Sequence, residues 1–311
     1  MTAGWVGRDA RELCALTGEQ DPARAMERLA RDLLDRADLT SPPFPPEVLA
    51  SFQGVREIRQ VEMAGAGRLV PTGSGLVIEV NRAHSLGRQN FTAMHEIAHT
   101  LLPSYRGEPV FDLQTETYDS PREEERLCDI GAAALLLDQR RLRSHAAEAG
   151  PSIALLAETA TLFQASLEAV ARQMAALDLW PVAFVLWEMG YRKDVRPRRG
   201  QLALGDLPPP DPTLRVARCY RSPSFHHFIP PNKSAETNSL VARCDANQPL
   251  TKGVERFPFK PGGVLLACEN AFVPYRRGAD HIIRVLSALV LDLGHVDRIA
   301  VAASPLPFEC F

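Results

Sequence analysis

Two histidines and a glutamate stand close together in the sequence at a spacing that suits metal chemistry. His95 and His99 are four residues apart, and Glu96 directly follows the first histidine. Residues four apart lie on the same face of an α-helix, so both imidazoles would point the same way. Two neutral imidazoles in that arrangement can hold one Zn²⁺ at about 2.0–2.1 Å. The spacing therefore predicts a hydrolytic zinc site in which His95 and His99 bind the metal and Glu96 acts on a water molecule.

The helix that must carry these residues is predicted from the sequence around them. Residues 91–102 contain neither Gly nor Pro. Four apolar side chains near the histidines would bury this helix, namely Ile97, Ala98, Leu101 and Leu102. A buried helix is a rigid support for a reactive site. The alternative interpretation is a structural helix whose histidines are satisfied by hydrogen bonds, but the surrounding residues favour the zinc interpretation.

A catalytic zinc site needs a third protein ligand, and a carboxylate in that role leaves the fourth position for water. Residues 121–137 are expected to form a second helix, because Pro suits the first helical position and carboxylates suit the first turn. Three consecutive glutamates in this turn compete to bind the metal: Glu123, Glu124 and Glu125. Helical geometry alone does not choose between them, and we expect the two that do not bind to be solvated.

Three segments of the chain together resemble the ImmA/IrrE family of metallopeptidases. They read Val77-Ile-Glu-Val-Asn81, Phe91-Thr-Ala-Met-His-Glu-Ile-Ala-His-Thr-Leu-Leu102 and Glu125-Arg-Leu-Cys-Asp-Ile-Gly-Ala-Ala-Ala-Leu-Leu-Leu137. The family has a strand that ends in Asn, a helix with the His-Glu-x-x-His motif, and a glutamate-bearing helix with small apolar residues. The resemblance covers about residues 50–140. Asn90 and Asp138 depart from the family pattern, at positions outside the metal chemistry.

The resemblance implies an intracellular zinc peptidase that cleaves helix-turn-helix repressors and thereby releases stress, phage or defence genes. In the family pattern, the third ligand stands three residues before a small residue that is followed by Asn or Asp. Cys128 and Asp129 occupy that pair here. The resemblance therefore implies that Glu125 is the third ligand of a Zn²⁺ cofactor, that Glu96 is the catalytic base, and that a helix-turn-helix repressor is the substrate.

An α+β fold with three parts is predicted for the whole chain. Residues 1–148 are expected to form a zincin-like zinc metallopeptidase domain, and residues 149–179 a helical, helix-turn-helix-like connector in which apolar residues recur at helical spacing. The connector has one cation, Arg172, so we expect it to pack against other elements rather than to read DNA. Residues 180–311 are expected to form a GAF-like α+β sensor domain, because IrrE-type family members carry one in this place.

The elements around the predicted site are expected to be helices and short strands. Residues 8–37 are predicted as one or two surface helices with a break near residues 18–22. Residues 55–63 and 75–81 are predicted as strands. The second of these leads into the metal helix, where an exposed strand could bind an extended peptide by backbone pairing. A core strand of a small sheet is the equally favoured alternative.

The C-terminal residues 180–311 alternate between strand-like and helix-like segments. Strands are expected at 181–187, 214–220, 263–269 and 297–303, and helices at 233–246 and 280–293. A mixed sheet with helices on its sides would account for this order. Fold analogy alone does not identify the ligand of such a domain.

Two basic segments of the C-terminal part could bind a polyanion. The first is residues 192–199, with five cations, and the second contains Tyr275, Arg276 and Arg277. Cations beside aromatic residues can bind single-stranded nucleic acid through phosphate pairing and base stacking. Tyr275, Arg276 and Arg277 are therefore a candidate ligand-binding site, with single-stranded DNA as the candidate activator. A solvated charged loop is the alternative for these residues.

Composition limits the classes of protein to which this chain can belong. The 311 residues carry a formal net charge of −3, which gives no global reason to expect nucleic-acid binding. No segment approaches about 18 consecutive apolar residues, and the charged N-terminal segment does not resemble a signal peptide. We therefore expect a soluble cytoplasmic protein, with a homodimer as a candidate assembly. Six cysteines without CxxC spacing indicate reduced thiols, and a redox signal at Cys219, Cys244 and Cys268 is the alternative to DNA.

Two classes of function are open at the level of the sequence. The first is a zinc endopeptidase, for which Tyr105, Tyr118 and His145 are candidates to stabilise the oxyanion. The second is a signal-binding regulatory protein whose zinc site is structural and which acts by association. Glu96 favours the first, because a structural zinc site does not need a general base.

Overall fold

The computed structural model describes residues 4–73, 75–105, 120–147, 149–191, 211–273, 275–277, 280–282 and 284–291. The chain forms two compact units. The N-terminal unit consists of Met1–Ser144 and Thr159–Ala169, and the C-terminal unit consists of His145–Glu158 and Val170–Phe311. Each unit has its own sheet. The domain boundaries expected at residues 148 and 179 stay a prediction.

A three-stranded sheet lies in the N-terminal unit, in the order β1-β3-β2. Its strands are β1 (Val55–Val61), β2 (Gly67–Thr72) and β3 (Gly75–Asn81). β3 pairs with β1 in parallel and with β2 in antiparallel orientation. Both predicted strands are confirmed, but β3 lies in the middle of the sheet and is paired on both sides. The expectation that residues 75–81 could offer a free backbone to a peptide is therefore wrong, and the core-strand alternative is correct.

Strand β2 is an edge strand that the sequence analysis did not predict. Gly and Pro near its ends indicate turns when they are considered locally. Its pairing with β3 runs from Gly67, opposite Val80, to Thr72, opposite Gly75. Pro71 is tolerated because an edge strand can spare the N–H that proline lacks. Long-range pairing with β3 thus outweighs the local turn signals.

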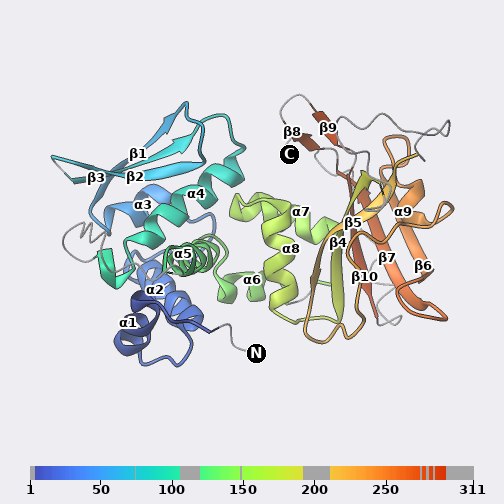
Figure 1. Ribbon diagram of the computed structural model, residues 1–311, viewed down its shortest axis with the longest axis horizontal. Coiled ribbons are helices and arrows are strands. Elements are labelled where there is room, and N and C mark those ends of the chain that lie inside the picture. The colour runs from blue at the N-terminus through green and yellow to red at the C-terminus, as the bar shows by residue number, and fades with distance from the viewer. Residues whose placement is uncertain are drawn as a thin grey trace, which may run out of the picture. The chain divides into compact units, whose positions relative to one another are not determined.

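Helices of the N-terminal unit stack in layers below this sheet (Figure 1). They are α1 (Arg8–Thr17), α2 (Pro22–Arg36), α3 (Pro46–Ser51), α4 (Leu86–His99), the short 3₁₀ helix η1 (Pro103–Tyr105), α5 (Ser120–Leu136) and most of α6 (Gln139–Ala146), whose last two residues belong to the C-terminal unit. α3 and α4 lie against the sheet, α5 packs on the other side of α4, and α1 and α2 lie beyond α5. The two helices predicted for residues 8–37 are confirmed. Their break follows from Gly18, whose φ of 75° is left-handed, and from Asp21, whose side chain caps Ala23 N–H at 3.1 Å.

Close packing between α4 and α5 depends on a small residue. A Cβ at Gly131 of α5 would lie 2.8 Å from the Cβ of Ala98 on α4, and 3.0 Å from Met26 Sδ on α2. Such a separation is too short for carbon atoms, so any side chain here would push the helices apart. Gly131 therefore fixes the distance between the two helices that carry the predicted metal ligands.

The helix pair expected in residues 149–179 is confirmed. It consists of α7 (Ile153–Phe163) and α8 (Leu167–Ala176), with Gln164 at a left-handed φ of 51° between them. The side chain of Asn90 donates a hydrogen bond of 3.1 Å to the carbonyl of Gln164, which gives this departure from the family pattern a packing role. Among the described residues, no single helix is long and apolar enough to cross a membrane. α7 and α8 meet that test only as a pair, which is bent by 111°.

The C-terminal unit contains a five-stranded antiparallel sheet in the order β5-β4-β10-β7-β6. The strands are β4 (Val182–Gly190), β5 (Thr213–Arg221), β6 (Leu250–Phe257), β7 (Val264–Phe272) and β10 (Arg284–Val290), with a two-stranded hairpin of β8 (Tyr275–Arg277) and β9 (Asp280–Ile282). One cluster of buried side chains, which includes Trp187 and Phe225, forms its core. The strands predicted at 181–187, 214–220 and 263–269 are confirmed.

Two predictions for this unit are wrong. Residues 280–293 were expected to be helical, but residues 280–290 supply strands β9 and β10. β10 lies in the centre of the sheet and is buried on both faces, so it lacks the polar alternation that identifies a strand. The helix expected at 233–246 is reduced to α9 (Leu240–Arg243). The sheet is consequently antiparallel rather than mixed, and the strand expected at 297–303 lies outside the described residues.

Candidate metal centre

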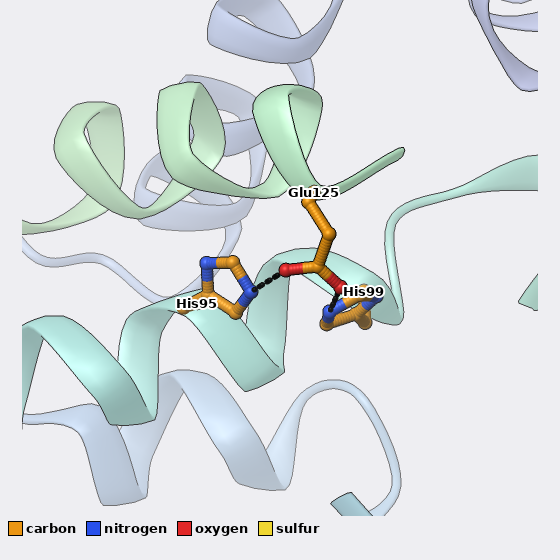
Figure 2. A group of neighbouring side chains, drawn as sticks. All are labelled: His95, His99 and Glu125. Carbon is orange, nitrogen blue, oxygen red and sulfur yellow. Dashed lines mark hydrogen bonds and ion pairs between the residues drawn. The ribbon is translucent and has the colours of Figure 1, made fainter. Parts of the chain in front are cut away.

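The metal-binding residues predicted from the sequence lie on two neighbouring helices. α4 carries His95 and His99 one turn apart, with ring centroids 5.0 Å apart and ring planes at 74°. α5 brings Glu125 to the same place. Its Oε2 lies 3.1 Å from His95 Nε2, and its Oε1 lies 3.6 Å from His99 Nε2. Figure 2 shows the carboxylate of Glu125 reaching both imidazole rings.

The chemistry and spacing of these donors fit a zinc ion. One ligand atom from each residue can be chosen so that all three lie within 4.8 Å of one another. Two ligands bound at about 2.0–2.1 Å to a tetrahedral zinc ion are about 3.4 Å apart. The two contacts of Glu125, at 3.1 and 3.6 Å, bracket that value. Within the described parts of the chain, no other group of His, Cys, Asp and Glu side chains meets the same criterion.

A fourth residue, Asp129, orients one of the imidazoles. The Nδ1 of His95 lies 3.1 Å from Asp129 Oδ1, and an ionised carboxylate can only accept, so His95 Nδ1–H is the donor. The Nε2 of His95 is thereby left to face Glu125 and the metal position. Such a carboxylate fixes the tautomer of a metal-binding histidine and raises its basicity. This role was not predicted from the sequence, although the four-residue spacing from Glu125 places both carboxylates on one face of α5.

The site opens into a cleft of about 650 Å³. Edge strand β2, the exposed face of α4, η1 and the first turns of α5 contribute its walls. Besides the metal-binding residues, the cleft is lined by, among others, Gly67, Leu69, Arg88, Glu96 and Tyr105. The cleft is large enough to hold several residues of a peptide, and it places Glu96 in the same space as the candidate ligands.

Gly67 allows β2 to approach the metal helix. A Cβ at this position would lie 2.3 Å from Thr92 Cγ2 and 2.8 Å from the carbonyl oxygen of Glu79. The carboxylate oxygen Oε1 of Glu96 would be 3.7 Å from the same atom. The strand therefore lies directly against the turn of α4 that carries Glu96, and only glycine fits there.

Burial dominates the electrostatics of the site. It raises the pKa of Glu96, assisted by Glu125 and opposed by His95 and the Leu69 N–H. Burial and the charge of His95 lower the pKa of His99, which favours the neutral imidazole that metal binding requires. Burial also disfavours protonation of His95, but its hydrogen bond to Asp129 and the surrounding carboxylates outweigh this effect and raise its pKa. A carboxylate with a raised pKa beside a metal position is suited to exchange protons.

Residues 54–174 match the family model of the IrrE N-terminal-like domain, which is peptidase family M78. This segment is an IrrE N-terminal-like domain. The match includes α4 and α5 and thus both halves of the candidate site. A solved structure described as a Mycobacterium tuberculosis transcriptional regulator resembles the chain with a TM-score of 0.55 and 13% identity, over 96% of this chain and 85% of that one. At that identity the likeness concerns the fold, and no curated protein matches the sequence.

The IrrE N-terminal-like domain places one of the three oxyanion candidates in the cleft. Tyr105, on η1, lines the cleft, and burial together with the negative charge of Glu96 raises its pKa. Tyr118 lies outside the described residues. His145 is not among the residues that line the cleft, and its Nε2 is buried without a hydrogen-bond partner. Tyr105 is therefore the candidate that the geometry supports.

The three glutamates at the start of α5 differ in their surroundings. Glu125 faces the histidines, whereas Glu123 is 6% exposed and accepts hydrogen bonds from Val6 and Gly7. The expectation that Glu123 is solvated is wrong, because two residues along a helix turn the side chain to the opposite face by about 200°. Glu124 is half-buried and does not belong to the metal-binding group.

The candidate ligand-binding residues of the C-terminal unit lie in a hairpin. Tyr275, Arg276 and Arg277 form β8, which pairs with β9, but their side chains and residues 192–199 lie outside the described parts of the chain. The structure gives no support to a redox signal. Burial raises the pKa of Cys219 to about 11 and those of Cys244 and Cys268 to about 12, so the reactive thiolate is scarce at neutral pH.

Proposed function

We propose that this protein is a zinc-dependent endopeptidase that cleaves a helix-turn-helix transcriptional repressor in the cytoplasm and so derepresses stress, phage or defence genes. The observation that carries the proposal is the convergence of His95, His99 and Glu125 beside a buried Glu96 in an open cleft. The family match of residues 54–174 to a peptidase domain supports the same conclusion. We infer a zincin-like arrangement from the helix that carries the motif and the edge strand beside it.

The roles of the residues follow from their positions. A zinc ion held by His95, His99 and Glu125 would supply a Lewis acid and lower the pKa of a water molecule. Glu96 takes the proton from the attacking water and passes it to the amine nitrogen that leaves. Tyr105 lines the same cleft, and we propose that its hydroxyl donates to the developing oxyanion.

An extended substrate segment has a place to bind. β2 is an edge strand that also lines the cleft, through residues such as Gly67 and Leu69. Edge strands bind extended peptides through main-chain hydrogen bonds. We propose that the repressor segment to be cleaved pairs with β2, which would hold its scissile bond between the strand and α4. An extended linker in the repressor satisfies this requirement, whereas a folded helix does not.

The alternative function is a regulatory protein in which the zinc site is structural and which acts by association. Structural zinc sites are closed by four protein ligands, whereas catalytic sites keep an open position. Here three candidate ligands face a cleft of about 650 Å³ that also contains a general base. This arrangement favours the peptidase.

The C-terminal unit is proposed to be a GAF-like sensor that controls cleavage. The cavity beside Trp187 and Phe257 in its described core holds about 10 Å³, which is room for about one water molecule. Single-stranded DNA, bound at the surface by Tyr275, Arg276 and Arg277, is the proposed activator.

The experiment that tests the proposed function compares wild type with Glu96→Gln. Both proteins are assayed for zinc content and for cleavage of a helix-turn-helix repressor encoded beside the gene. We expect about one zinc per chain in both, with cleavage by the wild type alone. Zinc in the wild type without cleavage of any candidate repressor, while the repressor binds tightly, would support the alternative function.

A further inference from the structure

An N-terminal segment, residues 5–9, contacts two elements that border the metal cleft, α5 and η1. It precedes the part of the chain that matches the IrrE N-terminal-like domain, which begins at residue 54. Its contacts reach the beginning of α5, the helix that carries Glu125. They also reach η1, the short helix that carries Tyr105. Residues 5–9 thus lie outside the matched segment, yet they contact two elements of the candidate site.

The contact with α5 is made by Glu123. This carboxylate accepts hydrogen bonds from Val6 N–H at 2.9 and 3.1 Å and from Gly7 N–H at 2.7 Å. A Cβ at Gly7 would lie 2.7 Å from Glu123 Oε2, so a larger residue here would displace this carboxylate. Next to it, the guanidinium of Arg126 lies 4.5 Å from the centre of the Trp5 ring, in a cation–π contact. Glu123 and Arg126, which stand two residues before and one residue after Glu125, are therefore held by the N-terminal segment.

The contact with η1 is made by Asp9. It accepts hydrogen bonds from the N–H and the Oγ–H of Ser104, each at 2.8 Å. Asp9 is 4% exposed. Ser104 directly precedes Tyr105. The hydrogen bonds between Asp9 and Ser104 therefore restrain the backbone next to the residue that is proposed to stabilise the oxyanion.

Both carboxylates are buried, and burial of a carboxylate is costly unless hydrogen bonds compensate it. The hydrogen bonds that the described residues form with both carboxylates join segments far apart in the sequence. Asp9 lies in the first turn of α1, whose N-cap residue, Gly7, provides no side-chain cap. Glu123 bonds to residues more than 100 positions away in the sequence. The Glu125 side chain is exposed and contacts His95 and His99, so the backbone of α5 sets how far its carboxylate can reach towards them.

We propose that the N-terminal segment positions the metal centre: Glu123 holds the start of α5 so that Glu125 can bind the metal, and Asp9 holds η1 so that Tyr105 faces the cleft. Glu123 and Asp9 are positioning residues. The inference rests on the proposed function for the role of Tyr105, whereas the role of Glu123 concerns metal binding alone.

The first test measures zinc affinity by competition with a chelator, without substrate. Glu123→Ala is expected to raise the zinc Kd at least about tenfold, similar to the loss of an outer-sphere partner. Glu123→Gln, which keeps one acceptor oxygen, is expected to fall between Glu123→Ala and wild type. The matched control is Glu12→Gln on the exposed face of α1, where Glu12 pairs with Arg8. Thermal unfolding of the metal-free variants shows how much of each change in zinc Kd results from a less stable fold.

The second test measures cleavage by zinc-loaded Asp9 variants. Asp9→Ala is expected to lower kcat about tenfold or more with little change in KM or zinc Kd. Asp9→Asn, whose side chain can still bond both polar groups of Ser104, is expected to restore most of kcat. If the role of Asp9 is purely structural, both variants would have a lower unfolding temperature, and the loss of kcat would not be separate from changes in KM and zinc Kd.

The outcomes distinguish the inference from the proposed function. An unchanged zinc Kd in folded Glu123→Gln and Glu123→Ala, with a wild type that binds zinc, would overturn the inference and leave the peptidase intact. A wild type that binds zinc but cleaves nothing would overturn the peptidase, while the Glu123 series would still decide the metal-positioning role. A wild type that binds no zinc would overturn both.

Discussion

His95 lies between two carboxylates that have different tasks. Glu125 meets its Nε2 and Asp129 meets its Nδ1, each at 3.1 Å. The first carboxylate is placed to bind the metal together with the imidazole, and the second to hold the imidazole in the correct tautomer. At the scale of single residues, the site therefore depends on which carboxylate of α5 faces which ring nitrogen.

The identity of the third ligand is tested by single alanine substitutions on α5. Glu125→Ala should weaken zinc binding by more than about 100-fold, because it removes a ligand rather than an outer partner. Glu124→Ala should leave zinc binding close to that of the wild type. Chelator competition on both proteins provides the measurement, and loss of zinc from Glu124→Ala instead of Glu125→Ala would show that the metal faces a different residue.

Asp129 should affect zinc binding without being a ligand. Asp129→Ala is expected to weaken zinc binding by about 10–100-fold, because His95 loses the partner that fixes its tautomer. Asp129→Asn keeps an acceptor and should lose less. Zinc titration of both variants checks this order, and Glu124→Ala again serves as the control. Equal zinc affinity in Asp129→Ala and wild type would contradict the role assigned to this residue.

At the scale of elements, the site is built by the approach of two segments to one helix. α4 carries the motif, α5 lies close to it because of Gly131, and β2 lies close to it because of Gly67. The two glycines leave no space for a side chain, so α5 and β2 lie closer to α4 than a larger residue would allow. Larger residues at either position should widen the site.

Gly67 provides the sharpest test of this arrangement. Gly67→Ala would bring a Cβ to 2.3 Å from Thr92 Cγ2 and 2.8 Å from a backbone oxygen of Glu79, so β2 or α4 must move. We expect a loss of about 1–3 kcal/mol in the free energy of unfolding, typical of overpacking, together with slower cleavage. The matched control is Gly73→Ala in the adjacent turn, where nothing lies within 4 Å. Urea denaturation of both variants measures the difference, and equal midpoints would refute the close approach of β2.

At the scale of the whole molecule, the N-terminal unit, which carries the candidate metal centre, is joined to a second unit with a separate core. The polar residues inside that core are satisfied by one another. Trp187 Nε1–H donates to Ser287 at 2.8 Å, Ser287 donates to Asn270 at 2.5 Å, and Asn270 donates to Thr251 at 3.1 Å. A buried chain of this kind defines one packing arrangement of the sheet.

At this scale, we predict that single-stranded DNA controls the proposed cleavage. A peptidase that cleaved its repressor constantly would leave nothing to regulate, so we expect single-stranded DNA to increase repressor cleavage. The stimulation should decline as salt rises, because phosphate contacts release counterions. Combined replacement of Arg276→Glu and Arg277→Glu should remove the stimulation and leave zinc content unchanged. Equal cleavage with and without DNA would reject this mode of control.

Local chemistry was determined by the sequence alone. The spacing of His95, Glu96 and His99 predicts their common orientation, because the period of a helix is a property of its own backbone. The strands at 55–63 and 75–81 and the helix pair at 149–179 were recognisable for the same reason, since each has a local pattern of apolar residues. The resemblance to a family added the choice of Glu125, which the spacing of the three glutamates had left open.

The tertiary structure decided everything that depends on segments distant in the chain. Glu123 and Glu125 look alike in the sequence, yet one bonds to the N-terminal segment and the other to the histidines, because they project from opposite faces of α5. β2 exists because β3 pairs with it, and β10 is a strand because neighbours cover both of its faces. The physical reason is that pairing and burial are energies shared between segments, so no local pattern contains them.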